Sequence, residues 1–269
     1  MILDAIVAHK SHEVEERKER RPLSQLQLAL AERAEPVRPF ASALRQGNGL
    51  SVIAEIKRKS PSGGELRPGV LAAELAALYA ANGAAALSVL TDYHHFGGED
   101  SDLVVARESS GLPALRKDFV IDEYQVYEAR CLGADAVLLI VRVLRSSELN
   151  HLLRVANRLG LAALVETHTA DEVARALDAG ARCIGVNNRD LDTLVTDPSL
   201  ALRLRPRVPR DCVYVAESGI SEPAQIAALA QAGVDAVLIG ESLLRSTDPA
   251  AKLREFVAAG HSATLVSGP

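Results

Sequence analysis

The chain has 269 residues, a formal net charge of −5, and apolar side chains at 48 % of its positions. Its basic residues are scattered, whereas a nucleic-acid-binding face needs them clustered, and no apolar run approaches the roughly 18 residues of a membrane-spanning helix. The N-terminus also lacks the apolar core of a signal peptide. We therefore expect a cytoplasmic protein that binds neither nucleic acid nor membrane. We also expect a monomer, although these observations do not bear on the oligomeric state.

Residues 1–48 predict a helical extension in front of the main domain. Ile2 and Ile6 have the spacing of one helical face, and residues 13–21 are charged all round, which is typical of a surface segment. Within the extension, residues 1 to about 30 are predicted to be helical, and the polar stretch 31–48 leads to the first strand. We expect this extension to cap the domain or to cover the mouth of its site.

A repeated unit follows the extension. Five times, a segment with helical apolar spacing ends in a glycine turn, and the turn leads into a continuous apolar run. Glycine just past a helix relieves the left-handed residue that commonly closes it. A continuous Val/Ile/Leu/Ala run is typical of a strand that is covered on both faces. The turns are Asn82-Gly83, Leu132-Gly133, Leu159-Gly160, Ala179-Gly180 and Ala232-Gly233.

Three more strands, near residues 51–56, 113–115 and 212–216, lack the glycine. The eight strands then begin near residues 51, 86, 113, 135, 162, 183, 212 and 235. This spacing suits a single-domain (β/α)8 barrel, the TIM barrel, over residues 1–269. The alternative is an open doubly wound sheet. Evenly sized units, and the lack of a Gly-x-Gly-x-x-Gly turn after the first strand, favour the barrel.

Polar residues end six of these strands. In a barrel the active site lies at the carboxyl ends of the strands, and side chains alternate along a strand, so Glu55 and Lys57 point the same way. The pattern predicts two lysines and three carboxylates around one mouth, without a His/Cys cluster of the metal-binding kind. For any single one of these strand-end residues, the alternative interpretation is that it forms a structural ion pair. The strand ends are Glu55-Ile56-Lys57, Arg116-Lys117-Asp118, Glu166, Asn187-Asn188-Arg189, Glu217-Ser218-Gly219 and Gly240-Glu241-Ser242.

Two glycine sites predict a phosphate site. Loops after the seventh and eighth barrel strands frequently bind phosphate through backbone amides and a helix N-terminus, and here they carry Ser218-Gly219 and Gly240-Glu241. The loop at residues 58–69 is basic and long for a strand-helix connection, so we expect a lid, with a plain surface loop as the alternative.

The three cysteines predict no disulfide framework. Cys131, Cys183 and Cys212 are far apart and odd in number. Two of them lie in predicted strands, so we interpret them as small core residues.

Residues 52–62, Val-Ile-Ala-Glu-Ile-Lys-Arg-Lys-Ser-Pro-Ser, closely resemble the signature of the indole-3-glycerol phosphate synthase family. The resemblance extends over essentially the whole chain, including residues 6–14 of the extension. Its combination of Glu-x-Lys-x-x-Ser-Pro with Arg-Lys-Asp-Phe is highly specific. The other matching segments are residues 90–98, 115–119, 164–167, 184–191, 216–220 and 239–243.

The resemblance implies an activity. That family converts 1-(2-carboxyphenylamino)-1-deoxyribulose 5-phosphate to indole-3-glycerol phosphate, releasing carbon dioxide and water, without a cofactor, in tryptophan biosynthesis. It implies that Lys117 is the general acid of ring closure and that Glu166, Glu55 and Lys57 serve dehydration, with the division among these three left open. A lysine suits this role if desolvation and neighbouring cations lower its pKa towards neutrality.

The resemblance also implies the binding residues. Asn187, Arg189, Glu217 and Ser218 match residues that bind and orient the substrate. Phe96, Phe119 and Leu191 match the pocket for the aminobenzoate ring, although Phe119 alone also suits ordinary core packing. Ser60, Gly219, Gly240 and Glu241 match the phosphate site, the last through its backbone amide.

One departure from the family pattern follows Ser60-Pro61-Ser62. Many relatives carry a lysine there, where this chain has Gly63-Gly64. The change removes a loop charge and is expected to loosen the lid without abolishing activity, because every position assigned to chemistry is filled.

Two other functions compete with this one. A phosphoribosylanthranilate isomerase needs a Cys/Asp acid-base pair at its strand ends, whereas the first strand here offers Glu55 and Lys57. A non-catalytic barrel that senses a phosphorylated metabolite would lack at least one acid-base residue, and none is missing.

Overall fold

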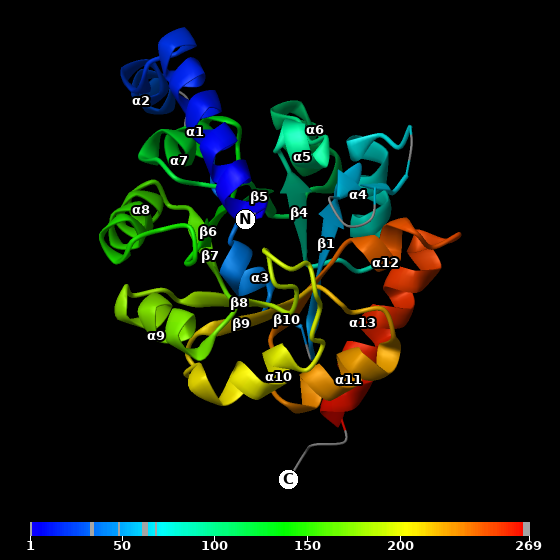
Figure 1. Cartoon of the computed structure of the whole chain (residues 1–269). Helices are drawn as coiled ribbons and strands as arrows, with labels where there is room; N and C mark the ends of the chain where they lie inside the picture. The colour runs from blue at the N-terminus through cyan, green and yellow to red at the C-terminus, as the bar shows by residue number, and fades with distance from the viewer. Residues whose placement is uncertain (1, 33–34, 48, 61–63, 68, 266–269) are drawn as a thin grey trace.

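A computed structural model describes residues 2–32, 35–47, 49–60, 64–67 and 69–265. Eight parallel strands close into a barrel in the order β1-β10-β9-β8-β7-β6-β5-β4, which confirms the predicted barrel and excludes the open sheet (Figure 1). Closure comes from β1, which pairs with both β4 and β10. The strands are β1 (Ser51–Ile56), β4 (Ala86–Leu90), β5 (Ala114–Lys117), β6 (Ala136–Ile140), β7 (Ala162–Thr167), β8 (Cys183–Asn187), β9 (Val213–Glu217) and β10 (Ala236–Ile239).

Helices surround the strands on the outside (Figure 1). The five predicted turn glycines all adopt left-handed backbone, with φ between 75° and 93°, so each helix ends where the sequence predicts. The helices are α4 (Ala72–Ala81), α5 (Tyr93–Phe96), α6 (Asp100–Ser110), α7 (Glu123–Cys131), α8 (Ser146–Arg158), α9 (Ala170–Asp178), α10 (Leu200–Leu204), α11 (Pro223–Gln231), α12 (Glu241–Leu244) and α13 (Pro249–Leu265), with a 3₁₀ turn at Arg205–Arg207.

The alternation of side chains along β1 determines the direction in which Glu55 and Lys57 point. Ala54 and Ile56 belong to the core between the strands and the helices, whereas Ile53 belongs to the core inside the barrel. Successive side chains of a strand point to opposite faces. Glu55 and Lys57 therefore share the inward direction of Ile53.

The first part of the chain forms three helices, α1 (Ile2–Arg20), α2 (Leu23–Glu32) and α3 (Phe40–Ala43). The predicted helical region 1–30 is thus two helices, which separate at Pro22, a residue that disfavours helix at the position before it. The start of α1 lies close to the middle of the ring of strands (Figure 1), and the buried side chains of Leu3 and Ile6 join the core inside the barrel.

The short helix α3 closes the opposite, amino-terminal end of the barrel. Its Phe40 belongs to the core inside the barrel. On either side of it, the Arg38 amide donates to Asp135 at 2.7 Å and the Arg45 guanidinium donates to Asp235 at 2.9 Å. These two aspartates directly precede β6 and β10, so the connection to β1 is tied across the bottom of the barrel.

The loop after β1 contains two short antiparallel strands, β2 (Lys59–Ser60) and β3 (Gly64–Glu65). Arg58 of this loop forms an ion pair with Asp102 of α6, and Lys59 donates to the carbonyl of His94 at 2.7 Å. Pro61, Ser62 and Gly63 lie outside the described residues.

Two of the three cysteines are core residues, as predicted. Cys183 and Cys212 are buried, and Cys131 is partly buried. Across the described part of the chain, no helix has the length and apolar character needed to cross a membrane.

Candidate active site

A cavity of about 420 Å³ lies at the carboxyl ends of the strands. Fourteen of the fifteen site residues expected from the sequence line it. They come from β1, β5, β7, β8, β9 and β10 and from the loops and short helices, α5 and α12 among them, that follow β4 and these strands. The exception is Ser60, whose side chain lies outside the described residues. Leu3 and Ile6 of α1 add an apolar wall that the sequence analysis did not assign to the site.

Lys117 is the centre of the charged cluster. It ends β5, and its ammonium lies 3.3 Å from Glu166 Oε2 and 3.3 Å from Glu217 Oε2. On the neighbouring side of the mouth, Lys57 Nζ lies 2.5 Å from Glu55 Oε2. The structure thus brings together the two lysines and three carboxylates that the strand ends predict.

The pKa of Lys117 is not lowered towards neutrality, which is the condition given above under which a lysine suits the acid role. Burial does act to lower the pKa of this ammonium, but the charges of Glu166, Glu217 and Glu55 outweigh it and raise the pKa above its ordinary value. The sequence pattern predicts three carboxylates at the same mouth, but it does not show that they are the charges nearest to the Lys117 ammonium. Lys117 is therefore held protonated, the state that a proton donor needs.

Glu166 and Glu217 share Lys117 but have pKa values shifted in opposite directions. Burial, together with the charges of Glu166 and Glu55, raises the pKa of Glu217 to about 7. For Glu166 burial also favours the neutral form, but Lys117, His168 and a hydrogen bond from Asn187 outweigh it and lower the pKa. Two carboxyls whose environments separate their pKa values are suited to different roles in acid-base catalysis.

Hydrogen bonds contribute to the difference between these two carboxyls, after the effects of burial and of neighbouring charges. The Asn187 amide donates to Glu166 Oε1 at 3.1 Å, whereas within the described residues neither oxygen of Glu217 has a hydrogen-bond partner. The space around Glu217 comes from Gly185 of β8, because a Cβ atom at that position would lie 2.3 Å from Glu217 Oε1. Glycine is required at position 185 because the Glu217 carboxylate lies so close. The sequence alone does not show this proximity.

His168 is a further residue at the site that sequence reasoning did not select. It is buried two positions after Glu166, with Nε2 3.4 Å from Glu166 Oε1 and Nδ1 3.2 Å from Glu172 Oε2. Burial acts to lower the pKa of this imidazole, but Glu172 and Glu166 raise it overall. A charged His168 favours the ionised form of Glu166. Its place just past the end of β7 is the only signal that the sequence offered.

The backbone after β9 is held in an unusual conformation. Ser218 and Gly219 both have left-handed φ values, 65° and 72°, which costs a non-glycine residue of order 1–3 kcal/mol and is found preferentially at functional sites. The Asn188 side chain donates to the Ser218 carbonyl at 2.9 Å and so helps to hold it.

Gly240, after β10, lies against the first strand. A Cβ atom there would lie 2.3 Å from Glu55 Oε2. Glu241 follows, and its carboxylate pairs with Arg245 at 3.0 Å and with Arg189 at 3.4 Å. The side chain of Glu241 is thus engaged with two guanidinium groups.

An apolar region faces the charged cluster. The rings of Phe96 and Phe119 lie with centroids 6.1 Å apart and planes tilted by 34°, and Leu191, Leu138 and Ile140 also line the cavity. Such a wall suits a flat aromatic group. Among the described residues, no group of three or more His, Cys, Asp or Glu side chains is arranged to hold a metal ion.

Comparison with known proteins identifies close relatives. The family model described as indole-3-glycerol phosphate synthase matches residues 3–256. The chain is 48 % identical over 261 residues to the indole-3-glycerol phosphate synthase of Dehalococcoides mccartyi, covering 96 % of this chain and 100 % of that protein. It is 49 % identical over 259 residues to the same-named protein of Acidithiobacillus ferrooxidans, covering 95 % and 98 %.

Solved structures share the fold at much lower identity. The 3-hexulose-6-phosphate synthase from Salmonella typhimurium superimposes with a TM-score of 0.61 at 16 % identity, over 81 % of this chain and 100 % of that chain. Thiamine phosphate pyrophosphorylase from Pyrococcus furiosus gives 0.59 at 16 % identity, over 82 % and 98 %. These likenesses show the barrel fold alone.

Proposed function

The chain belongs to the indole-3-glycerol phosphate synthase family, and from this premise we propose that the buried charges at its barrel mouth carry out the reaction. The enzyme is a carboxy-lyase of tryptophan biosynthesis that closes the indole ring of 1-(2-carboxyphenylamino)-1-deoxyribulose 5-phosphate. The observation that carries the proposal is the position of Lys117, within 3.3 Å of two buried carboxylates. The test is to mix the enzyme with this substrate and to measure the absorbance of the newly formed indole. Binding of the substrate without turnover would overturn the proposal.

For ring closure, Lys117 is the proposed general acid. The aromatic carbon that bears the carboxyl group attacks the ketone carbon, and Lys117 protonates the ketone oxygen as the new bond forms. Loss of carbon dioxide then restores the aromatic ring. Three carboxylates favour the protonated form of Lys117, so the proton is in place when the substrate arrives.

For dehydration, the proposed base is Glu166 and the proposed acid is Lys57. Glu166 is held ionised by Lys117, His168 and Asn187, which suits it to take the proton that the ring system loses. Lys57, paired with Glu55 at 2.5 Å, is placed to protonate the departing hydroxyl group, and Glu55 orients it. Positioned proton transfers of this kind each contribute about 10²–10⁴-fold to a rate.

The remaining residues are proposed to bind the two ends of the substrate. Phe96, Phe119 and Leu191 would hold the aminobenzoate ring, and Asn187, Arg189, Glu217 and Ser218 would orient the sugar chain. The phosphate would bind the backbone amides at Gly219, Gly240 and Glu241, with Ser60 of the loop after β1. Support comes from the shared cavity and from the left-handed turn at Ser218-Gly219.

The first test of the binding residues uses pH. Because the pKa of Glu217 is raised to about 7, its carboxyl is protonated below that pH and gains a negative charge above it. A further negative charge at the mouth opposes an anionic substrate, so we expect KM to contain a component that rises between pH 6 and 8 in the parent enzyme and is absent in Glu217→Gln. The substrate phosphate also titrates near pH 6, which is why steady-state kinetics on both proteins are compared. Identical pH dependence of KM in the two would contradict this assignment.

The second test separates backbone from charge at the phosphate site. Gly240→Val should raise KM by roughly tenfold or more, equivalent to about 1.4 kcal/mol of binding, because a side chain blocks the approach to the backbone. It should also lower kcat, since the new Cβ atom displaces Glu55. Glu241→Ala should do little, because its ion pair with Arg189 is partly exposed and exposed pairs contribute little. A large rise in KM for Glu241→Ala would count against this phosphate site.

We also propose that residues 1–269 act as one domain and that the enzyme works as a monomer in the cytoplasm. The extension and the barrel contribute to one cavity wall through Leu3 and Ile6, which supports the single domain. Size-exclusion chromatography with light scattering tests the monomer, for which a mass near 28.6 kDa is expected.

A further inference from the structure

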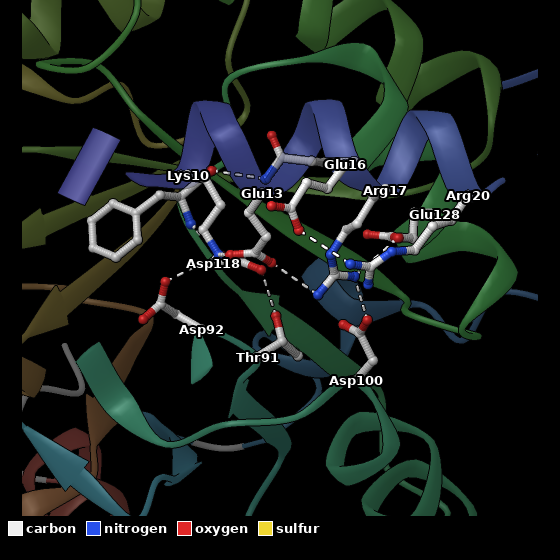
Figure 2. A network of polar contacts seen from close by, with 12 residues as sticks. Lys10, Glu13, Glu16, Arg17, Arg20, Thr91, Asp92, Asp100, Asp118 and Glu128 are labelled. Atoms are coloured by element: carbon white, nitrogen blue, oxygen red, sulfur yellow. Dashed lines mark hydrogen bonds and ion pairs between the residues drawn. The ribbon is translucent and has the colours of Figure 1, made fainter. Parts of the chain in front are cut away.

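Lys10 is a fully buried lysine on α1 that the reaction described above does not use. Its side chain is 1 % exposed, and its ammonium lies 2.8 Å from Glu13, 3.0 Å from Asp92 and 2.9 Å from Asp118 (Figure 2). Asp92 and Asp118 are themselves buried. A lysine is buried at this cost only when its charge is compensated, so α1 inserts a cation between two loops at the barrel mouth.

The carboxylate of Asp118 connects Lys10 to the backbone around Lys117. Asp118 directly follows Lys117. The Phe119 amide donates a hydrogen bond to Asp118 Oδ1 at 2.8 Å, and the Thr91 hydroxyl donates one to Asp118 Oδ2 at 2.8 Å. The Thr91 amide in turn donates to the Lys117 carbonyl at 3.2 Å. The backbone on the carboxyl side of Lys117 is therefore fixed by bonds that converge on Asp118.

This network lies beside the cavity. Lys117, Asp118 and Phe119 all line the cavity, but Asp118 is buried and its carboxylate pairs with Lys10. The preceding Arg116 does not line the cavity. Arg116 is 1 % exposed and contacts Asp100 at 3.0 Å and Glu128 at 2.9 Å.

Arg17 of α1 joins the same two carboxylates. It lies 3.0 Å from Glu128 and also pairs with Asp100 (Figure 2). Glu13 connects the two cations of α1, because it contacts both Lys10 and Arg17. A continuous, partly buried network thus runs from α1 to both sides of Lys117 in β5.

We propose that Lys10 is a positioning residue for catalysis: through Asp118 it holds the end of β5 so that Lys117 is presented to the substrate. The inference rests on the proposed role of Lys117 as general acid. Lys10 does not line the cavity and acts only through Asp118. The N-terminal helix is then part of the catalytic apparatus as well as a wall of the cavity.

The main test is Lys10→Met, which keeps most of the length of the side chain and removes its charge. Loss of the ion pair leaves Asp92 and Asp118 without their shared cation, so the end of β5 should shift. A misplacement of about 1 Å can cost about 10²-fold in rate, and we expect kcat to fall by about 10–10²-fold, with KM changed less than about threefold. A KM effect is not expected because the proposed phosphate site lies after β9 and β10. A parent-like kcat in the folded variant would overturn the proposal.

Lys18→Met is the matched control. Lys18 lies on the same helix and also contacts two carboxylates, Asp122 at 2.8 Å and Glu15 at 2.9 Å, but its side chain is 31 % exposed. Exposed pairs contribute little, so kcat should stay within about twofold of the parent. An equal loss of kcat in both variants would mean that any damage to α1 slows the enzyme, which would overturn a specific role for Lys10.

A second pair of variants keeps the test decisive if Lys10→Met does not fold. Lys10→Met/Asp118→Asn removes both charges and leaves fewer buried charges without a partner, so it should fold as judged by circular dichroism and thermal melting. A positioning role predicts that its kcat stays low, because the link to α1 is still missing. A purely structural role predicts that kcat returns with stability, and that result would overturn the proposal.

Combination with Lys117→Ala separates this inference from the role of Lys117. If Lys10 acts through Lys117, Lys10→Met should have almost no further effect on kcat in the Lys117→Ala background, since coupled residues are non-additive. Full additivity would overturn the positioning role alone. A parent-like kcat in the Lys117→Ala single variant would instead overturn the general-acid assignment.

Discussion

Lys117→Ala is expected to lower kcat by about 10²–10⁴-fold, the usual worth of a positioned proton transfer. KM should change much less, because the lost interaction belongs to the transition state and the substrate is bound by other groups. The position of Lys117 between Glu166 and Glu217 means that its loss also removes their shared cation. Steady-state kinetics, with thermal melts to confirm folding, measure the two effects separately.

Lys117→Arg distinguishes a proton donor from a binding cation. A guanidinium group remains protonated near neutral pH and does not readily give up its proton, so arginine should not restore kcat if Lys117 is the general acid. If Lys117 only pairs with the carboxylates, arginine should keep most of the activity, and alanine should raise KM or lower the melting temperature. An arginine variant with kcat within about threefold of the parent would rule out the acid role.

Glu166→Gln is the second change for which we expect a large loss, again about 10²–10⁴-fold in kcat. Glutamine keeps the shape and the contact with Asn187 but cannot accept a proton. Glu166 also raises the pKa of Lys117, so its removal should lower that pKa and move the alkaline limb of the kcat profile to lower pH. The measurement is kcat against pH for the parent and the variant.

Glu172→Gln controls for the loss of a buried ion pair near Glu166. Glu172 is the other carboxylate on His168, at 3.2 Å, and it does not line the cavity. Its replacement should lower the melting temperature but leave kcat within a few-fold of the parent. A Glu166→Gln variant that behaves in the same way would show that Glu166 is structural.

Local pattern was enough to predict the residues that gather at the mouth. The strands are continuous apolar runs, and Glu55, Lys117, Glu166, Asn187 and Glu217 each occur where such a run stops. In a closed parallel barrel all such ends meet at one opening, so their proximity follows from topology without any knowledge of distances.

The features that could not be predicted from the sequence are those that depend on contacts between particular atoms. The sign of the shift in the pKa of Lys117 follows from three carboxylates on other strands. They lie 49 (Glu166), 62 (Glu55) and 100 (Glu217) positions from Lys117 along the chain. The burial of Lys10 depends on contacts with Asp92 and Asp118, which belong to two different loops. On sequence alone, Lys10 is one charge among many in a polar helix, and its spacing gives no hint of its partners.

Gly185 and Gly240 limit how this enzyme can be made more heat-resistant. Neither has a left-handed φ, so by backbone angle alone both would be chosen for replacement by alanine, which at compatible sites stabilises a protein by about 0.4–1 kcal/mol. A methyl group at either position would meet a carboxylate oxygen at 2.3 Å, of Glu217 and Glu55 respectively. A library selected for thermal resistance at these positions would therefore enrich variants whose acidic side chains have been displaced, and any gain in stability there would come with a loss of turnover.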